Sequence, residues 1–403
     1  MKKTILLIST MDTKGEETLY LKKKIEEIGP GTLLMDLAMR GEEASPADIP
    51  PEQVAEAAGS SLREIHESKD RARITNMTIS GACRVARDLL SEGKIDGVAG
   101  LGGSTGSLMA TEVMRALPFG IPKIMVSSTA ALPGLSTRYI GTGDIALFHT
   151  VIEISGLSSL LKNVLDRAAH AVAAMTLGGV APTQTAEGKA IALTMLGPCE
   201  KCASAVQKEL EKAGYQVIGF SAAGIGDRAM EEMISQGLFH GVVDLAPGGV
   251  GEHLYGFMRD AGPRRLESAG KRGIPQVVST CSVNHMTPAK SRYKPEYHER
   301  RKYDLDKFRT WLRMSPEELE EVAGVFAGKL NAAQGPVRVV VPKKGWSSVD
   351  APGNATYDPD EDSLFVRRLR TELRPDVPIT EVDANMEAPE FARAVIRAAM
   401  DVF

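Results

Sequence analysis

The chain has 403 residues, of which 43% are hydrophobic and 25% charged, and its formal net charge is −4. This length predicts two or three domains, and the composition is typical of a globular α/β protein. With no overall basic charge we expect no nucleic-acid partner, and with no apolar stretch near the roughly 20 residues that span a bilayer we expect no membrane contact. Basic runs at 264–265 and 300–302 are expected on solvated faces. Four cysteines form no disulfide framework, which predicts a cytoplasmic protein.

Short apolar runs alternate with helical patterns in the first half of the chain, which is typical of a parallel sheet covered on both faces. The strands are predicted at 3–10, 32–36, 95–101 and 122–127. The helices are predicted at 15–28, 51–67, 71–92, 104–117 and 157–176.

Turn residues collect over 178–188, and we place a domain boundary there, giving domains 1–182 and 183–403. The alternation then resumes, so the predicted fold is α/β, with two doubly wound, mostly parallel Rossmann-like domains and a ligand cleft between them. Strands are predicted at 189–197, 215–220, 240–246, 274–279, 336–341 and 378–382. Helices are predicted at 200–213, 227–236, 252–261, 315–332, 361–372 and 388–402.

A glycine-rich loop between the strand at 95–101 and the next helix is the main candidate binding site. Glycine lets a backbone approach a ligand, and a helix N-terminus presents N–H groups and a positive dipole end to an anion. We therefore expect a phosphate or carboxylate here; the alternative is a tight turn that only packs the helix onto the sheet. The residues assigned to the ligand are Gly102, Gly103, Ser104, Thr105 and Gly106.

A second polar segment follows the first predicted strand. It contains Asp12, Thr13 and Lys14, which place a carboxylate, a hydroxyl and a cation at the same sheet edge as the glycine loop. We assign all three to the ligand. The alternative is that Asp12 or Thr13 only caps the following helix, with Glu16 or Glu17 completing the capping arrangement.

The fourth predicted strand is followed by a long loop with further candidates. Ser127 and Ser128 close the strand, and Arg138 could bind a phosphate through both of its terminal nitrogens. Asp144 is assigned to a magnesium ion. Long loops in compact domains are often functional, but a domain or subunit interface explains this one equally well.

The second half of the chain supplies the candidates for proton transfer. Asp227 and Glu252 follow strand ends, and His285 lies in a polar run after the strand at 274–279. Carboxylates and imidazole are the usual general acids and bases, and His253 lies beside Glu252. The alternatives are helix capping for Asp227, a place in the first turn of a helix for Glu252 and a structural role for His285.

Cys199 and Cys202 form a C-x-x-C sequence at the start of a predicted helix. A helix N-terminus favours the thiolate, so a redox role has a mechanism. We interpret the pair as ordinary thiols in a turn, because proline precedes the first cysteine instead of lying between the two. No second C-x-x-C completes a structural zinc site.

Four segments, at 12–16, 100–107, 117–123 and 224–231, carry a resemblance to a known family. The chain resembles a divergent bacterial member of the uncharacterised bacterial and plant family related to the tomato mosaic virus resistance protein. This resemblance implies two α/β domains, a homodimer or higher homo-oligomer, and ATP with Mg²⁺ bound in the first domain. It also implies a separate TIM-barrel protein as a partner.

Together these features predict a small-molecule enzyme that binds an anionic or phosphorylated ligand in the interdomain cleft. A carbon–carbon lyase or an isomerase acting on an oxo acid is our hypothesis for the reaction. The alternative is a non-catalytic, dimeric regulatory protein that binds ATP. We expect no NAD, because the glycine loop follows a late strand and lacks the dinucleotide-binding spacing.

Overall fold

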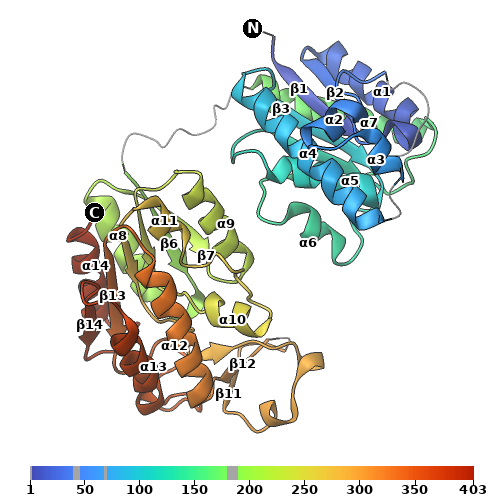
Figure 1. Cartoon of the computed structure of the whole chain (residues 1–403). Helices are drawn as coiled ribbons and strands as arrows, with labels where there is room; N and C mark the ends of the chain where they lie inside the picture. The colour runs from blue at the N-terminus through green and yellow to red at the C-terminus, as the bar shows by residue number, and fades with distance from the viewer. Residues whose placement is uncertain (1, 40–45, 68–69, 179–188, 308) are drawn as a thin grey trace. The chain divides into compact units, whose positions relative to one another are not determined.

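The computed structural model divides the chain into two compact units, Met1–Thr183 and Gln184–Phe403 (Figure 1). The predicted boundary falls within 179–188, outside the described residues, and the predicted cleft between the domains stays a prediction. The structure describes residues 2–39, 46–67, 70–178, 189–307 and 309–403.

In its described part, the first unit contains a five-stranded parallel sheet with the order β2-β1-β3-β4-β5. Apolar runs dominate the inner strands because both faces of the sheet are covered. The short edge strand β5 is half exposed, which explains why its sequence shows no strand pattern. The strands are β1 (Thr4–Ser9), β2 (Gly31–Asp36), β3 (Gly97–Gly102), β4 (Lys123–Ser127) and β5 (Ala146–His149).

The helices of the first unit cover its sheet on both sides. Alternate residues of β1 pack on opposite faces: Leu6 contributes to the cluster with α4 and α5, and Leu7 to the cluster with α1 and α7. The helix predicted over 51–67 is two helices, separated by a turn in which Gly59 has φ +76°. The helices are α1 (Met11–Ile28), α2 (Pro51–Ala57), α3 (Leu62–Glu67), α4 (Arg71–Ser91), α5 (Ser104–Arg115), α6 (Leu135–Ile140) and α7 (Ser159–Leu177).

The second unit contains, among its described residues, a six-stranded parallel sheet with the order β14-β13-β9-β8-β6-β7. Both units thus turn from one side of the first strand to the other, which is the doubly wound arrangement, and the predicted fold class is confirmed. The strands are β6 (Ala190–Met195), β7 (Gln216–Ser221), β8 (Gly241–Asp244), β9 (Gln276–Val278), β13 (Val337–Pro342) and β14 (Ile379–Val382).

The second sheet is also covered on both faces. Leu193 packs in the cluster with α8 and α14, whereas Ala192 lies in the cluster with α9. The helix predicted over 252–261 begins earlier and ends at Tyr255, because the next residue, Gly256, has a φ of +69°. The helices are α8 (Glu200–Lys212), α9 (Ile225–Ser235), α10 (Gly249–Tyr255), α11 (Ser268–Arg272), α12 (Pro316–Asn331), α13 (Pro359–Glu372) and α14 (Pro389–Met400).

A small antiparallel sheet, absent from the predictions, extends the second unit near α12 (Figure 1). Its strands are too short for a periodic signal and are defined by pairing, as with Tyr303 opposite Trp311. Among the described helices, none is long and apolar enough to cross a bilayer. The strands are β10 (His285–Met286), β11 (Lys302–Asp304) and β12 (Thr310–Arg313), and the short 3-10 turns are η1 (Gly197–Cys199), η2 (Lys290–Arg292) and η3 (Pro295–Tyr297).

Candidate functional site

The carboxyl ends of β1, β3 and β4 form one edge of the first sheet, at the point where the strand order changes direction. Gly102 at the end of β3 pairs with Ser127 at the end of β4, and Ser9 at the end of β1 donates through Oγ to Leu101 O at 3.1 Å. Ligands of doubly wound sheets bind at this switch point. The predicted glycine loop therefore lies at the edge where such a fold holds its ligand.

The first turn of α5 faces this edge. Gly103 is the N-cap residue, and among the described residues no side chain caps the helix. A Cβ on Gly102 would lie 3.0 Å from Gly106 Cα, so the strand can approach the first turn of the helix this closely only because residue 102 has no side chain. The N–H groups of Ser104 and Thr105 belong to this turn, which carries the positive end of the helix dipole.

Hydroxyl groups from the two neighbouring strand ends flank this turn. A Cβ on Gly106 would lie 3.8 Å from Thr10 Oγ1, and one on Gly103 would lie 3.8 Å from Ser128 Oγ. Thr10 in turn shares a 2.9 Å hydrogen bond with the Thr13 hydroxyl. Hydroxyls and helix N–H groups together form a polar cradle of the kind that binds phosphate oxygens. We call Thr10, Thr13, Gly103–Gly106 and Ser128 the glycine-loop cradle.

Lys14 lies close to this cradle but has partners of its own. Its Nζ donates to Ile154 O and lies 3.5 Å from Glu153 Oε1. Ser128 Oγ also donates to Glu153 Oε1 at 3.3 Å. Lys14 therefore ties the segment after β5 to the cradle, and a ligand role for its ammonium group stays a prediction.

Asp12 is the exposed carboxylate at the start of α1. Partial burial and then the neighbouring Asp36 carboxylate raise the pKa of Asp12. Asp36 is itself 1% exposed and accepts from Met11 N at 2.9 Å, which stabilises the first turn of α1. A cation beside Asp12 would offset the repulsion between the two carboxylates.

Two of the predicted ligand residues are occupied elsewhere. Ser127 is buried, and its Oγ accepts from Ser107 Oγ at 2.7 Å, so this hydroxyl packs α5 against the sheet instead of facing a ligand. Asp144 lies 2.6 Å from Nζ of Lys123, which is buried at the amino end of β4, away from the glycine-loop cradle. Arg138 is exposed on α6. The structure thus does not bring Asp144 to the predicted phosphate site.

In the second unit, a buried arginine contacts three carboxylates from two elements, α9 and β8. Arg265 is 0% exposed; its Nε donates to Asp227 Oδ1 at 2.8 Å, its Nη2 to Asp244 Oδ1 at 2.8 Å, and its Nη1 lies 3.4 Å from Glu231 Oε1. Asp227 also accepts from Gly224 N at 2.8 Å, so the capping interpretation is confirmed for this residue. The expectation that Arg265 is solvated was wrong, because its charge is neutralised inside the fold.

Glu252 forms a similar buried pair with another arginine. Its Oε1 lies 2.7 Å from Arg259 Nη2, and its Oε2 accepts from Thr287 Oγ1 at 2.6 Å. The Arg259 guanidinium also lies over the Trp311 ring, 4.6 Å from its centroid. Glu252 is 0% exposed, so these contacts compensate its charge in the interior.

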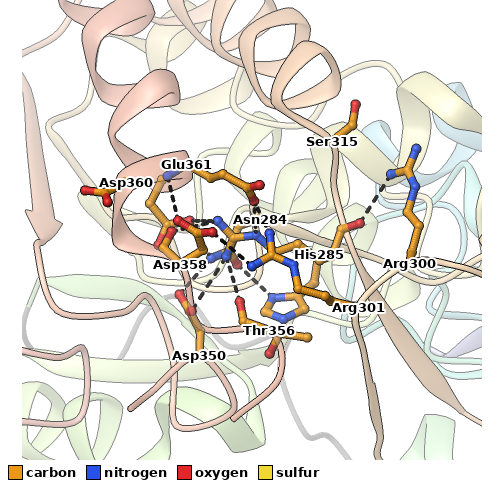
Figure 2. Close-up of polar contacts among 12 residues, drawn as sticks. Asn284, His285, Arg300, Arg301, Ser315, Asp350, Thr356, Asp358, Asp360 and Glu361 are labelled. Atoms are coloured by element: carbon orange, nitrogen blue, oxygen red, sulfur yellow. Dashed lines mark hydrogen bonds and ion pairs between the residues drawn. The ribbon is translucent and has the colours of Figure 1, made fainter. Parts of the chain in front are cut away.

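His285 lies in a buried polar network between β10 and the segment before α13 (Figure 2). Its Nδ1 donates to Asn284 Oδ1 at 2.7 Å, while its Nε2 has no hydrogen-bond partner among the described residues. The Asn284 amide donates to Asp350 Oδ2 at 2.7 Å and to Asp362 Oδ1 at 2.9 Å. Arg313 completes the network at 2.6 Å from Asp362 Oδ1. The polar run around His285 is therefore interior.

The electrostatics of this network follow from its burial. Burial, then the guanidinium groups of Arg313 and Arg259, lower the pKa of His285 well below its ordinary value. Burial, then the neighbouring Asp350 carboxyl, raise the pKa of Asp362 well above its ordinary value. The imidazole is thus held neutral, and the carboxyl of Asp362 favours its protonated form.

The two parts of the chain each match a part of one family. Residues 3–180 match the N-terminal domain and residues 188–403 the C-terminal domain of the uncharacterised protein family UPF0261. This chain belongs to the UPF0261 family. The predicted resemblance is therefore confirmed, and it covers both units.

Relatives of this UPF0261 chain occur in bacteria and plants. A UPF0261 protein of Clostridium tetani is 35% identical over 399 residues, 98% of each chain. The ToMV resistance protein Tm-1 of Solanum lycopersicum is 32% identical over 318 residues, which are 77% of this chain and 42% of the tomato protein. A UDP-N-acetylglucosamine 2-epimerase structure aligns with 98% of this chain and 95% of its own, but at 12% identity and a TM-score of 0.23 it supports no argument.

The UPF0261 chain also contains residues that the sequence did not single out. Arg259 and Arg313 each neutralise buried carboxylates, and a single charged residue carries no sequence signal that separates burial from exposure. The thiols of Cys199 and Cys202 are free and buried, and burial raises the pKa of Cys202. A raised thiol pKa opposes thiolate chemistry, which agrees with the interpretation of two ordinary thiols.

Proposed function

We propose that the first unit binds a phosphorylated small molecule in the glycine-loop cradle, with ATP and Mg²⁺ as the first ligand to test. The observation that carries this proposal is the first turn of α5, which follows Gly103 and lacks a side-chain cap among the described residues. A 12-residue helix presents N–H groups and a positive dipole end to a phosphate. The hydroxyls of Thr10 and Ser128 beside this turn support the same class of ligand.

A nucleotide-bound magnesium ion is also compatible with this edge. Mg²⁺ is usually held by one or two carboxylates together with phosphate oxygens and water. We assign Asp12 to the ion in place of Asp144, because Asp12 is exposed beside Thr13 of the cradle, whereas Asp144 is paired with Lys123. No group of three His, Cys, Asp or Glu side chains in the described chain is arranged to hold a metal, so the phosphates would supply further ligands.

The second unit favours a form of this proposal in which the ligand is bound but not converted. The three side chains predicted to transfer protons, Asp227, Glu252 and His285, are each 0% exposed. Two of them are engaged by buried arginines, and His285 is held neutral in a closed network. A lyase or isomerase reaction would need other groups.

The proposal is tested by two substitutions at one position. An aspartate at Gly106 adds a negative charge to the first turn of α5, which stabilises the helix but repels a phosphate. An alanine there places a Cβ 3.8 Å from its nearest neighbours, an ordinary contact, so Gly106→Ala should bind as the wild type does. Calorimetric titration would measure the affinities of three ligands: ATP in the presence of Mg²⁺, pyrophosphate, and adenosine.

We expect wild type and Gly106→Ala to bind ATP–Mg²⁺ and Gly106→Asp to lose at least tenfold in affinity. Ligand at about 100 times its dissociation constant should also stabilise the first unit by about 2.7 kcal/mol. The assignment of the phosphates to α5 would be contradicted if adenosine were the only one of the three ligands to bind, or if Gly106→Asp bound ATP as tightly as the wild type.

A further inference from the structure

A pocket lies within the second unit, lined by the middle of α9, the last turn of α10 and the segment that follows α10. Its volume is about 260 Å³, which suits a small metabolite and is below the usual range for drug-sized ligands. The pocket is lined by Arg228, Glu231, Glu232, His253, Ala261, Gly262, Pro263 and Arg264.

The imidazole in this pocket has a defined orientation. His253 Nδ1 lies 2.8 Å from Asp260 Oδ1, and Asp260 is held by Gly262 N at 2.6 Å. Burial raises the pKa of Asp260, but the hydrogen bonds from Gly262 N and His253 outweigh it and lower the pKa, so the group is a carboxylate that can only accept. Nδ1 therefore carries the proton, and Nε2 of a neutral His253 is left as a hydrogen-bond acceptor.

Two guanidinium groups supply the positive charge of the pocket. The guanidinium of Arg228 is held by Asp260: its Nε donates to Asp260 O at 3.1 Å, and its Nη2 lies 3.1 Å from Asp260 Oδ1. Arg264 lies 3.4 Å from Glu232 Oε1, and its side chain is 56% exposed. An exposed ion pair of this length contributes little, so a carboxylate ligand can compete for Arg264.

The negative charge of Glu231, which lines the pocket, is compensated by neighbouring groups of the protein. Glu231 accepts from Leu266 N at 2.7 Å and from Ser268 N at 2.9 Å, and its Oε1 lies 3.4 Å from Nη1 of the buried Arg265. The remaining charges at the pocket are two arginines against Glu232 and Asp260. The pocket therefore combines sites for an anion with acceptors for a hydroxyl group.

We propose that this pocket binds a small hydroxycarboxylate, with Arg228 and Arg264 holding the carboxylate and His253 Nε2 accepting from the ligand hydroxyl. Planar guanidinium groups match a carboxylate in two-point contact, which a point charge cannot do. A hydroxyl that pairs with a fixed acceptor is discriminated from its deoxy analogue, because the unpaired acceptor loses a hydrogen bond. All residues that line this pocket belong to the second unit, and the proposal does not rest on ATP binding.

Calorimetric titration of the full chain tests this with matched probes: malate against succinate and citrate against tricarballylate, with inorganic phosphate as a further arm. We expect at least one hydroxy acid to bind, about tenfold more tightly than its deoxy analogue. Arg264→Gln should weaken both acids of that pair by tenfold or more. The exposed Arg393→Gln on α14 removes the same charge elsewhere and should change neither.

A change at His253 separates the hydroxyl contact from the charge contacts. His253→Phe should reduce the affinity for the hydroxy acid to that of the deoxy analogue and leave the latter within twofold, a coupling that loss of folding would not produce. Thermal melting of each variant reports its fold. Binding of phosphate but of no carboxylate, no difference between the paired acids, or wild-type affinity in Arg264→Gln would overturn the proposal.

Discussion

Replacing Arg265 with methionine removes the cation from the most buried charge cluster of the second unit. The variant keeps an apolar side chain of similar length but leaves Asp227, Asp244 and Glu231 without the guanidinium that contacts all three. Arg265 is 0% exposed, so water cannot replace those contacts without opening the fold. The neighbouring Arg264, with a 56% exposed side chain, is the matched control.

The expected loss follows from the cost of an uncompensated buried charge. Removing one partner of a buried pair typically destabilises by about 3–5 kcal/mol, whereas an exposed substitution usually changes stability by less than about 0.5 kcal/mol. Arg265→Met should therefore lose at least about 3 kcal/mol, a large part of the about 5–15 kcal/mol that holds an ordinary domain. Urea unfolding at pH 7, followed by circular dichroism, measures this against Arg264→Met.

The pH dependence distinguishes lost charge compensation from lost packing. Without Arg265, the three carboxylates repel one another, which raises their pKa values in the folded state above those of the unfolded state. Protonation then favours folding, so the gap between Arg265→Met and the wild type should narrow as the pH falls from 7 to 5. A loss below about 1 kcal/mol at pH 7, or a gap independent of pH, would refute this reasoning.

Three further outcomes follow from other contacts. Asp144→Asn should destabilise the first unit by about 3 kcal/mol in urea unfolding, because Lys123 stays buried without its carboxylate, while ATP affinity stays within twofold. The folded state disfavours protonated His285, so the stability that this residue contributes above pH ~6.5 is lost as the pH falls. His285→Gln should therefore reduce the slope of the unfolding free energy against pH, below pH ~6.5, by up to about 1.4 kcal/mol per pH unit. Ser315→Ala removes the hydroxyl that accepts from Glu318 N at 3.3 Å and should cost about 1 kcal/mol in melting experiments.

The parallel strands could be predicted from the sequence because their side chains meet apolar layers on both faces. The apolar run of β1 (Thr4–Ser9) is of this kind, and β3 and β4 of the same sheet begin and end within a few residues of the predicted bounds. Strand β5 and the small antiparallel sheet were missed, because their residues are exposed or too few to show a period. A local sequence pattern indicates which residues are buried, whereas these elements are defined by their pairing with other strands.

The glycine loop could be placed at the ligand edge because strand, turn and helix are contiguous in the chain. The contributions of Thr10 and Ser128 to the same cradle come from different strands, and only the strand order brings them together. Asp144 shows the opposite case. Its sequence neighbours suggested a metal ligand, but the fold pairs it with Lys123 at the other end of β4.

The sequence by itself determined two doubly wound units, their family, and a glycine turn that leads into a helix at the end of a strand, because all three depend on order along the chain. Only the tertiary structure decided which charges face water. Arg265 and Arg264 are adjacent in sequence, yet one is enclosed by three carboxylates and the other lies at a pocket mouth. Burial of a charge depends on partners distant in the chain, and no local pattern encodes them.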